Sequence, residues 1–162
     1  LANARMVSFR TRSSTFSILQ DPENTTTGGC IWETAYLLAQ WIEQWLSNAD
    51  GHWSEQWKEH LRGERPAVRC MEVGAGCGLL GIALAHMGGD VLLTETGDAM
   101  ANLERNVSAN EPPAESLGSV ASRRLHWGER EDIEAATRDR FDDEGVRRAQ
   151  RLPPPACELS SR

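Results

Sequence analysis

Short apolar runs alternate with amphipathic stretches through the middle of the chain. Residues 68–73 (VRCMEV) and 91–94 (VLLT) are apolar runs of strand length, and each predicts a buried strand. Residues 79–87 and 98–110 carry apolar side chains at helical spacing, and residues 120–127 predict a third strand. The order strand, helix, strand, helix, strand is typical of an α/β protein with a Rossmann-like, doubly wound parallel sheet.

The segment before these strands has a different pattern. Residues 7–20 alternate loosely between apolar and polar, which predicts one or two short strands that bury Val7, Phe9, Phe16 and Ile18. Residues 21–29 are rich in turn formers and predict a loop. Residues 32–46 predict a helix with one apolar face, formed by Ala35, Leu38, Ala39, Ile42, Trp45 and Leu46. Residues 48–65 predict a connection or a short helix, with His52 and His60 at the surface.

The character of the sequence changes after Trp127. Residues 128–162 contain nine acidic residues and seven arginines, and three consecutive prolines precede a polar tail. This segment predicts a surface helix over residues 131–140 and no further buried strand. We therefore divide the chain into an N-terminal strand and loop segment (1–26), a main domain (27–142) and a disordered tail (143–162).

Composition narrows the class of protein. The 162 residues carry a net charge of −7, and no apolar run approaches the ~20 residues of a membrane-spanning helix. Net acidity argues against a nucleic-acid-binding protein, which usually presents a basic face. The cysteines are irregularly spaced without a C-x-x-C pair, which favours reduced thiols in the cytoplasm or nucleus over disulfides or a zinc site. We predict no metal site and no membrane partner.

The main chemical signal is a glycine-rich turn after the first predicted strand. Gly74, Gly76 and Gly78 alternate with other residues, so the backbone can turn tightly and a ligand can lie against it at a helix N-terminus. Glu95 follows Gly74 by 21 positions, where a carboxylate can accept hydrogen bonds from both hydroxyls of a ribose. Dinucleotides and S-adenosylmethionine both use this geometry. Glu72, two residues before the first glycine, suits a cationic methionine group better than a pyrophosphate and favours S-adenosylmethionine.

Several sequence blocks together resemble one known family. The chain is similar to the class I, seven-β-strand methyltransferases, and specifically to the protein-lysine methyltransferases of family 16 (the METTL21-like enzymes). The resemblance covers roughly residues 7–142. The matching blocks are T-G-G-C-I-W-E (27–33), E-V-G-A-G-C-G-L-L-G (72–81), L-T-E-T (93–96), N-L-E-R-N-V (102–107) and L-H-W-G (125–128).

The resemblance implies a role for each matching site residue. Trp32 would line the cofactor pocket, and Trp127 would lie against the adenine, where an apolar wall suits a flat base. Glu95 would hold the ribose, although the family usually has Asp at this position. The remaining cofactor-binding residues would be Glu72, Gly74, Ala75, Gly76 and Gly78. We interpret the other tryptophans as structural: Trp41, Trp45, Trp53 and Trp57.

The part of the family pattern that carries the methyl acceptor is missing. Complete enzymes of this family continue into a fourth strand, which leads to an acidic residue and a tyrosine beside the acceptor site. Here Phe141-Asp142 stands where that strand should open, and the pattern then stops. The chain thus corresponds to the N-terminal, cofactor-binding half of the fold, and the sequence names no catalytic residue. We expect the first strand to become an exposed apolar edge, and the isolated chain to be marginally stable or prone to aggregation.

Three functions stay open at this stage. The leading hypothesis is a methyltransferase that uses S-adenosyl-L-methionine and acts on a lysine of a protein partner, in the cytoplasm or the nucleus, with its activity in this short chain in doubt. The second is a non-catalytic module that binds the cofactor or a partner. The third is an NAD-dependent oxidoreductase. The sequence determines neither the methyl acceptor nor the oligomeric state.

Overall fold

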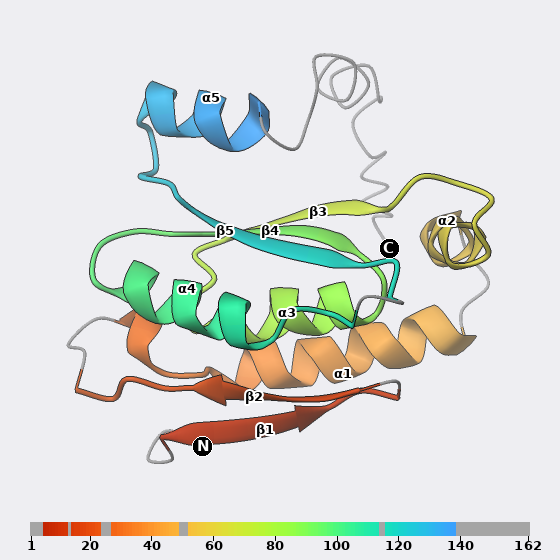
Figure 1. Ribbon diagram of the computed structural model, residues 1–162, viewed down its shortest axis with the longest axis horizontal. Helices are drawn as coiled ribbons and strands as arrows, with labels where there is room; N and C mark the ends of the chain where they lie inside the picture. The colour runs from red at the N-terminus through yellow and green to blue at the C-terminus, as the bar shows by residue number, and fades with distance from the viewer. Residues whose placement is uncertain (1–4, 13, 24–26, 49–51, 114–115, 139–162) are drawn as a thin grey trace, which may run out of the picture.

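A parallel sheet of three strands forms the centre of the protein in the computed structural model, which describes residues 5–12, 14–23, 27–48, 52–113 and 116–138 (Figure 1). The strands are β3 (Arg69–Val73), β4 (Asp90–Glu95) and β5 (Ser119–Arg124), in the order β3-β4-β5. Helices α3 (Leu79–His86) and α4 (Ala99–Ala109) connect them. The predicted α/β, Rossmann-like fold is confirmed.

The core lies between the sheet and the helices on one of its faces. The side chains of Val91 and Leu93 on β4 point to this face and are fully buried against α3 and α4. Helix α3 is apolar all round and has five buried residues, as expected of a helix enclosed by the sheet, α1 and neighbouring loops. It ends at His86, and Gly88, directly after the C-cap residue Met87, has a φ of 99° that favours glycine.

An N-terminal hairpin forms a further layer on the far side of the helices (Figure 1). Its strands are β1 (Met6–Arg10) and β2 (Thr15–Leu19), paired antiparallel. The four predicted inward residues are all buried: Val7, Phe9, Phe16 and Ile18. The loop after β2 contains one turn of 3-10 helix, η1 (Thr27–Gly29).

Asparagine side chains of α4 attach the hairpin. The Asn106 side chain accepts a hydrogen bond from the Leu19 N–H and donates one to the Leu19 carbonyl, both at 2.9 Å. Asn110, one turn later, makes the same pair of bonds with Ser17 at 3.1 and 3.0 Å. These amides satisfy backbone groups of β2 that no neighbouring strand of the described chain reaches, which the apolar pattern of the sequence did not indicate.

Helix α1 (Glu33–Asn48) confirms the predicted helix but buries a different set of residues. Of the predicted apolar face only Ala39 is fully buried, and Leu38 is 42% exposed. Tyr36, outside the predicted face, packs edge-on against Phe9 and joins the core. The prediction for Leu38 was wrong because α1 lies against the hairpin and α3. These elements contact a strip of the α1 surface that is narrower than the predicted apolar face and is rotated away from Leu38.

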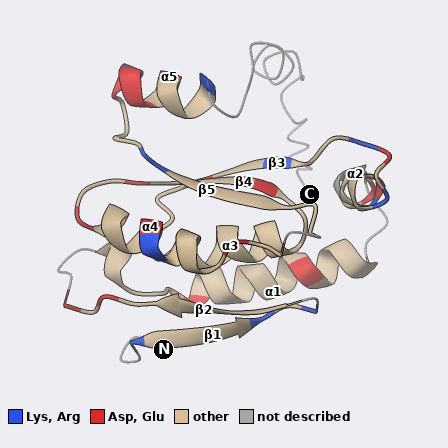
Figure 2. Ribbon diagram, in the orientation of Figure 1, with Lys and Arg blue, Asp and Glu red and all other residues tan. Residues whose placement is uncertain are grey.

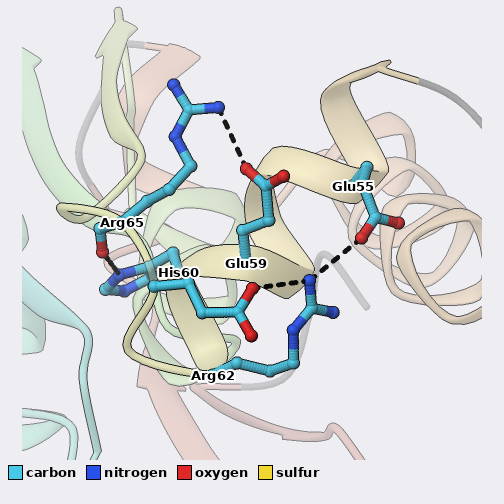
Figure 3. A network of polar contacts seen from close by, with 6 residues as sticks. Glu55, Glu59, His60, Arg62 and Arg65 are labelled. Atoms are coloured by element: carbon cyan, nitrogen blue, oxygen red, sulfur yellow. Dashed lines mark hydrogen bonds and ion pairs between the residues drawn. The ribbon is translucent and has the colours of Figure 1, made fainter.

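The polar stretch that follows is a helix, α2 (His52–Leu61), whose buried residues include Ser54, Trp57 and His60. Trp57 is buried, as expected of a structural tryptophan, and its Nε1–H donates to the Met87 carbonyl at 2.7 Å. The prediction of a surface His60 was wrong, because this side chain is only 5% exposed. Its Nε2 lies 2.9 Å from the Gly88 carbonyl and its Nδ1 lies 3.2 Å from the Arg65 carbonyl (Figure 3).

Helix α5 (Arg130–Arg138) lies over the opposite face of the sheet (Figure 1). Its Ala136 is buried in a small cluster with Leu92 and Leu125, so the predicted surface helix is confirmed with one anchoring residue. Acidic residues lie in the first turn of α5 and a basic residue lies in its last turn, and residues of both charges lie on the turn after α2 (Figure 2). The predicted tail, 143–162, lies outside the described residues.

The first strand is less buried than its apolar sequence predicts. Within the described residues β3 pairs only with β4, and Val73 is 52% exposed. The prediction of a buried strand was therefore wrong, while the expected exposed edge is present in the described part of the chain. Strand β5 ends at Arg124, earlier than predicted, because His126 and Trp127 turn away to line a cavity.

No helix in the described ranges is both long enough and apolar enough to cross a membrane.

Candidate cofactor site

A cavity of about 810 Å³ opens at the carboxyl ends of the three parallel strands. This is the edge at which doubly wound sheets bind their ligands. The loops after β3, β4 and β5 all contribute to its wall, together with the start of α1. All eight predicted cofactor-binding residues line it: Trp32, Glu72, Gly74, Ala75, Gly76, Gly78, Glu95 and Trp127.

The glycine-rich turn is held by hydrogen bonds to the neighbouring strand. The backbone N–H groups of Gly74 and Ala75 both donate to the Thr94 carbonyl, at 3.0 and 2.9 Å. Gly76 has a φ of 56°, and a Cβ there would meet the backbone of Gly28 at 3.5 Å. The turn therefore favours glycine for its left-handed conformation, while the loop before α1 lies at ordinary van der Waals distance from it.

Glu95 is fixed at the end of β4 by two backbone donors. Its Oε2 accepts from the Gly76 N–H at 2.7 Å, and its Oε1 accepts from the Thr96 N–H at 2.9 Å. Each carboxylate oxygen keeps a second lone pair. Glu95 is therefore positioned between the glycine turn and the cavity with remaining capacity to accept hydrogen bonds from a ligand.

Glu72 is a partly buried carboxyl group on the wall of the same cavity. Its Oε2 accepts from the Gly81 N–H at 2.9 Å, and the described residues provide it with no basic partner. Burial raises the pKa of Glu72 to about 7, the hydrogen bond from Gly81 opposes this rise, and the nearby Glu95 adds to it. A cation in the cavity would reverse the shift, because it would stabilise the ionised carboxylate.

Gly81 is required by the packing around Glu72. A Cβ at this position would clash with Leu93 Cδ2 and would lie 2.8 Å from Glu72 Oε2. Gly81, the third residue of α3, thus has no side chain, so that the helix can approach both the sheet and the Glu72 carboxyl group.

Two tryptophans form exposed apolar walls of the cavity. Trp127 is 74% exposed, and its ring edge lies 3.4 Å from the position of a Cβ on Gly74. Trp32 is 60% exposed, and its Nε1–H donates to the Thr27 carbonyl at 3.0 Å. Large aromatic side chains that remain exposed within a concave site are typical of ligand contact rather than of core packing.

His126 is a polar residue of the cavity wall that sequence reasoning did not assign to the site. Asp132 Oδ2 lies 2.7 Å from its Nδ1 and accepts from its backbone N–H at 2.8 Å. The available signal was the position of His126 inside the L-H-W-G block, with an acid six residues later in the first turn of a predicted helix.

Cys77, on the wall of the cavity, is not activated. Cys77 is buried, and desolvation raises the pKa of its thiol to about 12. Its Sγ lies 3.4 Å from the Gly28 carbonyl, so it fills the space between two loops. Among the described residues no cluster of three His, Cys, Asp or Glu has the arrangement of a metal site.

Comparison with known proteins identifies the family. A family described as lysine methyltransferase matches residues 10–142. The chain belongs to this lysine methyltransferase family. Its relatives include protein N-lysine methyltransferase METTL21A of Mus musculus, which is 28% identical over 137 residues, 85% of this chain and 54% of the relative.

Two further relatives of the lysine methyltransferase family have comparable identity over shorter shares of their length. EEF1A lysine methyltransferase 3 of Mus musculus is 33% identical over 98 residues, 60% of this chain and 34% of the relative. Protein-lysine N-methyltransferase rrg1 of Schizosaccharomyces pombe is 31% identical over 116 residues, 68% of this chain and 32% of the relative. The chain spans about half or less of the length of these relatives.

Proposed function

We propose that this chain binds S-adenosylmethionine in the cavity and serves in the methylation of a protein lysine, in the cytoplasm or the nucleus. The observation that carries the proposal is Glu72, a partly buried carboxyl group on the cavity wall that has no basic partner among the described residues. Such a group favours a ligand with a cationic end. The family and the printed names of its members, which are N-lysine methyltransferases, support lysine as the acceptor.

The residues present fit an adenosyl-methionine ligand from end to end. Glu72 would hold the ammonium group of the methionine part, and the bare backbone of Gly74 and Gly76 would lie along it. Glu95 would accept hydrogen bonds from the ribose hydroxyls. Trp127 would cover one face of the base.

The cofactor, when bound, supplies a methyl group already activated by the sulfonium charge. This chain's residues would then fix its position and exclude water from one side, which lowers the entropic cost of the transfer. Trp32 would exclude water, because it lies on the cavity wall between α1 and the loop that precedes it.

A nicotinamide dinucleotide fits the same cavity less well. Its pyrophosphate would lie at the glycine turn, next to the carboxyl group of Glu72, whereas Glu95 suits the ribose of either ligand. An acid close to two phosphate charges would repel the ligand in a partly buried site.

The proposal is tested by titration calorimetry of the full chain with S-adenosylhomocysteine and with NAD. We expect binding of S-adenosylhomocysteine only, and a loss of affinity of roughly tenfold in Glu95→Gln, which is isosteric but weakens acceptance from the ribose. Binding of NAD in preference to S-adenosylhomocysteine would overturn the proposal.

Transfer of a labelled methyl group from S-adenosylmethionine to lysine in a protein lysate tests the catalytic part. Because the chain covers about half of its relatives, a non-catalytic cofactor-binding module is the second candidate function. Binding of S-adenosylhomocysteine without any transfer of label would favour this candidate.

A further inference from the structure

A histidine beside Trp127 is held in one orientation by an acid of α5. Asp132 Oδ2 accepts a hydrogen bond from the His126 backbone and lies 2.7 Å from its Nδ1. Asp132 occupies the first turn of α5, where the helix dipole favours a negative charge. The bonds from the His126 backbone and side chain lower the pKa of Asp132. An ionised carboxylate only accepts hydrogen bonds, so the ring carries its proton on Nδ1.

The other ring nitrogen is available to a ligand. No residue in the described part of the chain hydrogen-bonds His126 Nε2, the side chain is half-exposed, and His126 lines the cavity. When the proton of a neutral imidazole lies on Nδ1, Nε2 is an acceptor. The cavity wall therefore presents one oriented hydrogen-bond acceptor next to an aromatic ring.

The place of His126 in the fold indicates which part of a nucleoside it meets. The Leu125 N–H donates to the Glu95 carbonyl at 2.9 Å, so the segment that carries His126 begins directly beside the residue expected at the ribose. A base attached to that ribose has Trp127 as its wall and His126 at its edge. Adenine presents at this edge an exocyclic amino group, which is a donor.

We propose that His126 determines specificity for adenine: its Nε2 accepts a hydrogen bond from the exocyclic amino group, and Asp132 positions the ring. This inference rests on the proposed function, because it presupposes an adenosyl ligand in the cavity. Hypoxanthine carries a carbonyl oxygen in place of the amino group, so two acceptors would face each other. A site built to pair with an N–H group rejects an analogue that lacks it.

The test compares S-adenosylhomocysteine with S-inosylhomocysteine by titration calorimetry on the full chain. We expect the wild-type protein to bind the adenine ligand about tenfold or more tightly than the hypoxanthine ligand. In His126→Phe, which keeps a flat ring but has no acceptor, the ratio should fall to about threefold or less. Asp132→Ala should lower the ratio as well, because the ring is then free to rotate.

Glu131→Ala is the matched control for Asp132. Glu131 is the neighbouring acid in the same turn of α5 and is exposed, so its removal changes the charge but not the position of His126. Far-ultraviolet circular dichroism of each variant shows whether it is folded.

A second measurement needs no variant. In protein with ¹⁵N-labelled histidine, the Nε2 resonance of His126 should shift when S-adenosylhomocysteine is added and should shift much less with S-inosylhomocysteine. An unchanged binding ratio in folded His126→Phe, or an Nε2 resonance that does not move, would overturn the role of His126 while leaving the proposed function in place. Failure of the wild-type protein to bind either nucleoside would overturn both.

Discussion

At the scale of single residues, the position of Glu72 in the fold changes the pKa of its carboxyl group. It lies one residue from the end of β3, and the alternation of the strand turns it toward α3, where it is enclosed. Burial raises the pKa of its carboxyl group from an ordinary value of 4.5 to about 7. The folded protein therefore holds a proton on Glu72 in a pH range where the unfolded chain has released it.

This shift predicts that stability falls as the pH rises from about 4.5 to about 7. In that range the native state binds more protons than the unfolded state, so the free energy of unfolding decreases with pH. Glu72→Gln removes the titrating group and should raise the free energy of unfolding at pH 8 by roughly 1–3 kcal/mol relative to wild type, with little change at pH 4.5. Urea denaturation at both pH values measures this. Equal effects at the two pH values would show that Glu72 does not titrate as described.

The same variant should bind S-adenosylhomocysteine more weakly than wild type at pH 8. Glutamine cannot neutralise the ammonium group, so we expect roughly a tenfold loss of affinity. Wild-type affinity should also rise between pH 6 and pH 8 as Glu72 ionises, whereas that of Glu72→Gln should stay nearly flat. Parallel pH profiles of the two proteins, measured by calorimetry, would contradict this assignment.

At the scale of secondary-structure elements, polar side chains rather than apolar contacts fix several junctions. Asn106 is buried at the junction between α4 and β2, where its amide also donates to the Cys77 carbonyl at 2.9 Å. It thereby links the hairpin, α4 and the end of the glycine turn. An apolar side chain at this position could fill the space but would leave the Leu19 N–H without a partner, whereas the Leu19 carbonyl would keep its hydrogen bond from the Asn102 side chain at 3.0 Å.

We therefore predict that Asn106→Leu is destabilising although the residue is buried. Loss of the bonds to Leu19 and Cys77 should cost about 2–4 kcal/mol, because buried donors and acceptors remain unsatisfied. Ser108→Ala on the exposed face of α4 is the control and should change stability by less than about 0.5 kcal/mol. Urea denaturation gives both values, and similar values for the two variants would refute the role of the amide.

The junction of α2 with α3 and the loop before β3 has both buried and exposed polar contacts. His60 reaches the carbonyls of Gly88 and Arg65, whereas the ion pairs Arg65–Glu59 and Arg62–Glu55 lie at the surface (Figure 3). Exposed ion pairs contribute little because water screens them. The buried histidine should therefore account for most of the polar stabilisation at this junction.

A comparison of His60→Phe with Glu59→Ala tests whether the buried histidine or the surface ion pairs contribute more to stability. We expect His60→Phe to lower the free energy of unfolding by about 1–3 kcal/mol, because the Gly88 carbonyl loses its buried hydrogen-bond partner, and Glu59→Ala to lower it by less than about 1 kcal/mol. Thermal or urea unfolding shows which of the two variants is the less stable. A larger effect of Glu59→Ala would show that the surface pairs dominate.

At the scale of the whole molecule, the two edges of the described sheet differ in their side chains. Strand β5 ends in Arg123 and Arg124, and charged edges discourage pairing with another chain. Strand β3 carries Met71 and an exposed Val73 near its end. An apolar edge with unpaired backbone groups is a template for association.

We predict that the isolated chain self-associates through β3 and is only marginally stable. Light scattering should show a mass that increases with protein concentration, and Val73→Lys should reduce this increase because it adds charge to the edge. Ser122→Lys on β5, the control, should leave it unchanged. A monomer at all concentrations that unfolds cooperatively at ordinary mesophilic temperatures would contradict the prediction.

The sequence by itself determined the order of the strands and helices and the residues of the glycine turn. It could do so because apolar periodicity and glycine placement are local properties of the chain, and because Glu72 and Glu95 lie at fixed intervals from that turn. The alternating pattern also predicted the buried face of the hairpin, but the tertiary structure decided which residues of α1 and α2 are buried. Leu38 is exposed and His60 is buried because contacts with distant elements, not helical period, set the environment of each. The hydrogen bonds of His126 with Asp132 and of Asn106 with β2 likewise depend on the folded arrangement. A side-chain hydrogen bond produces no periodic pattern in the sequence, so the sequence did not predict them.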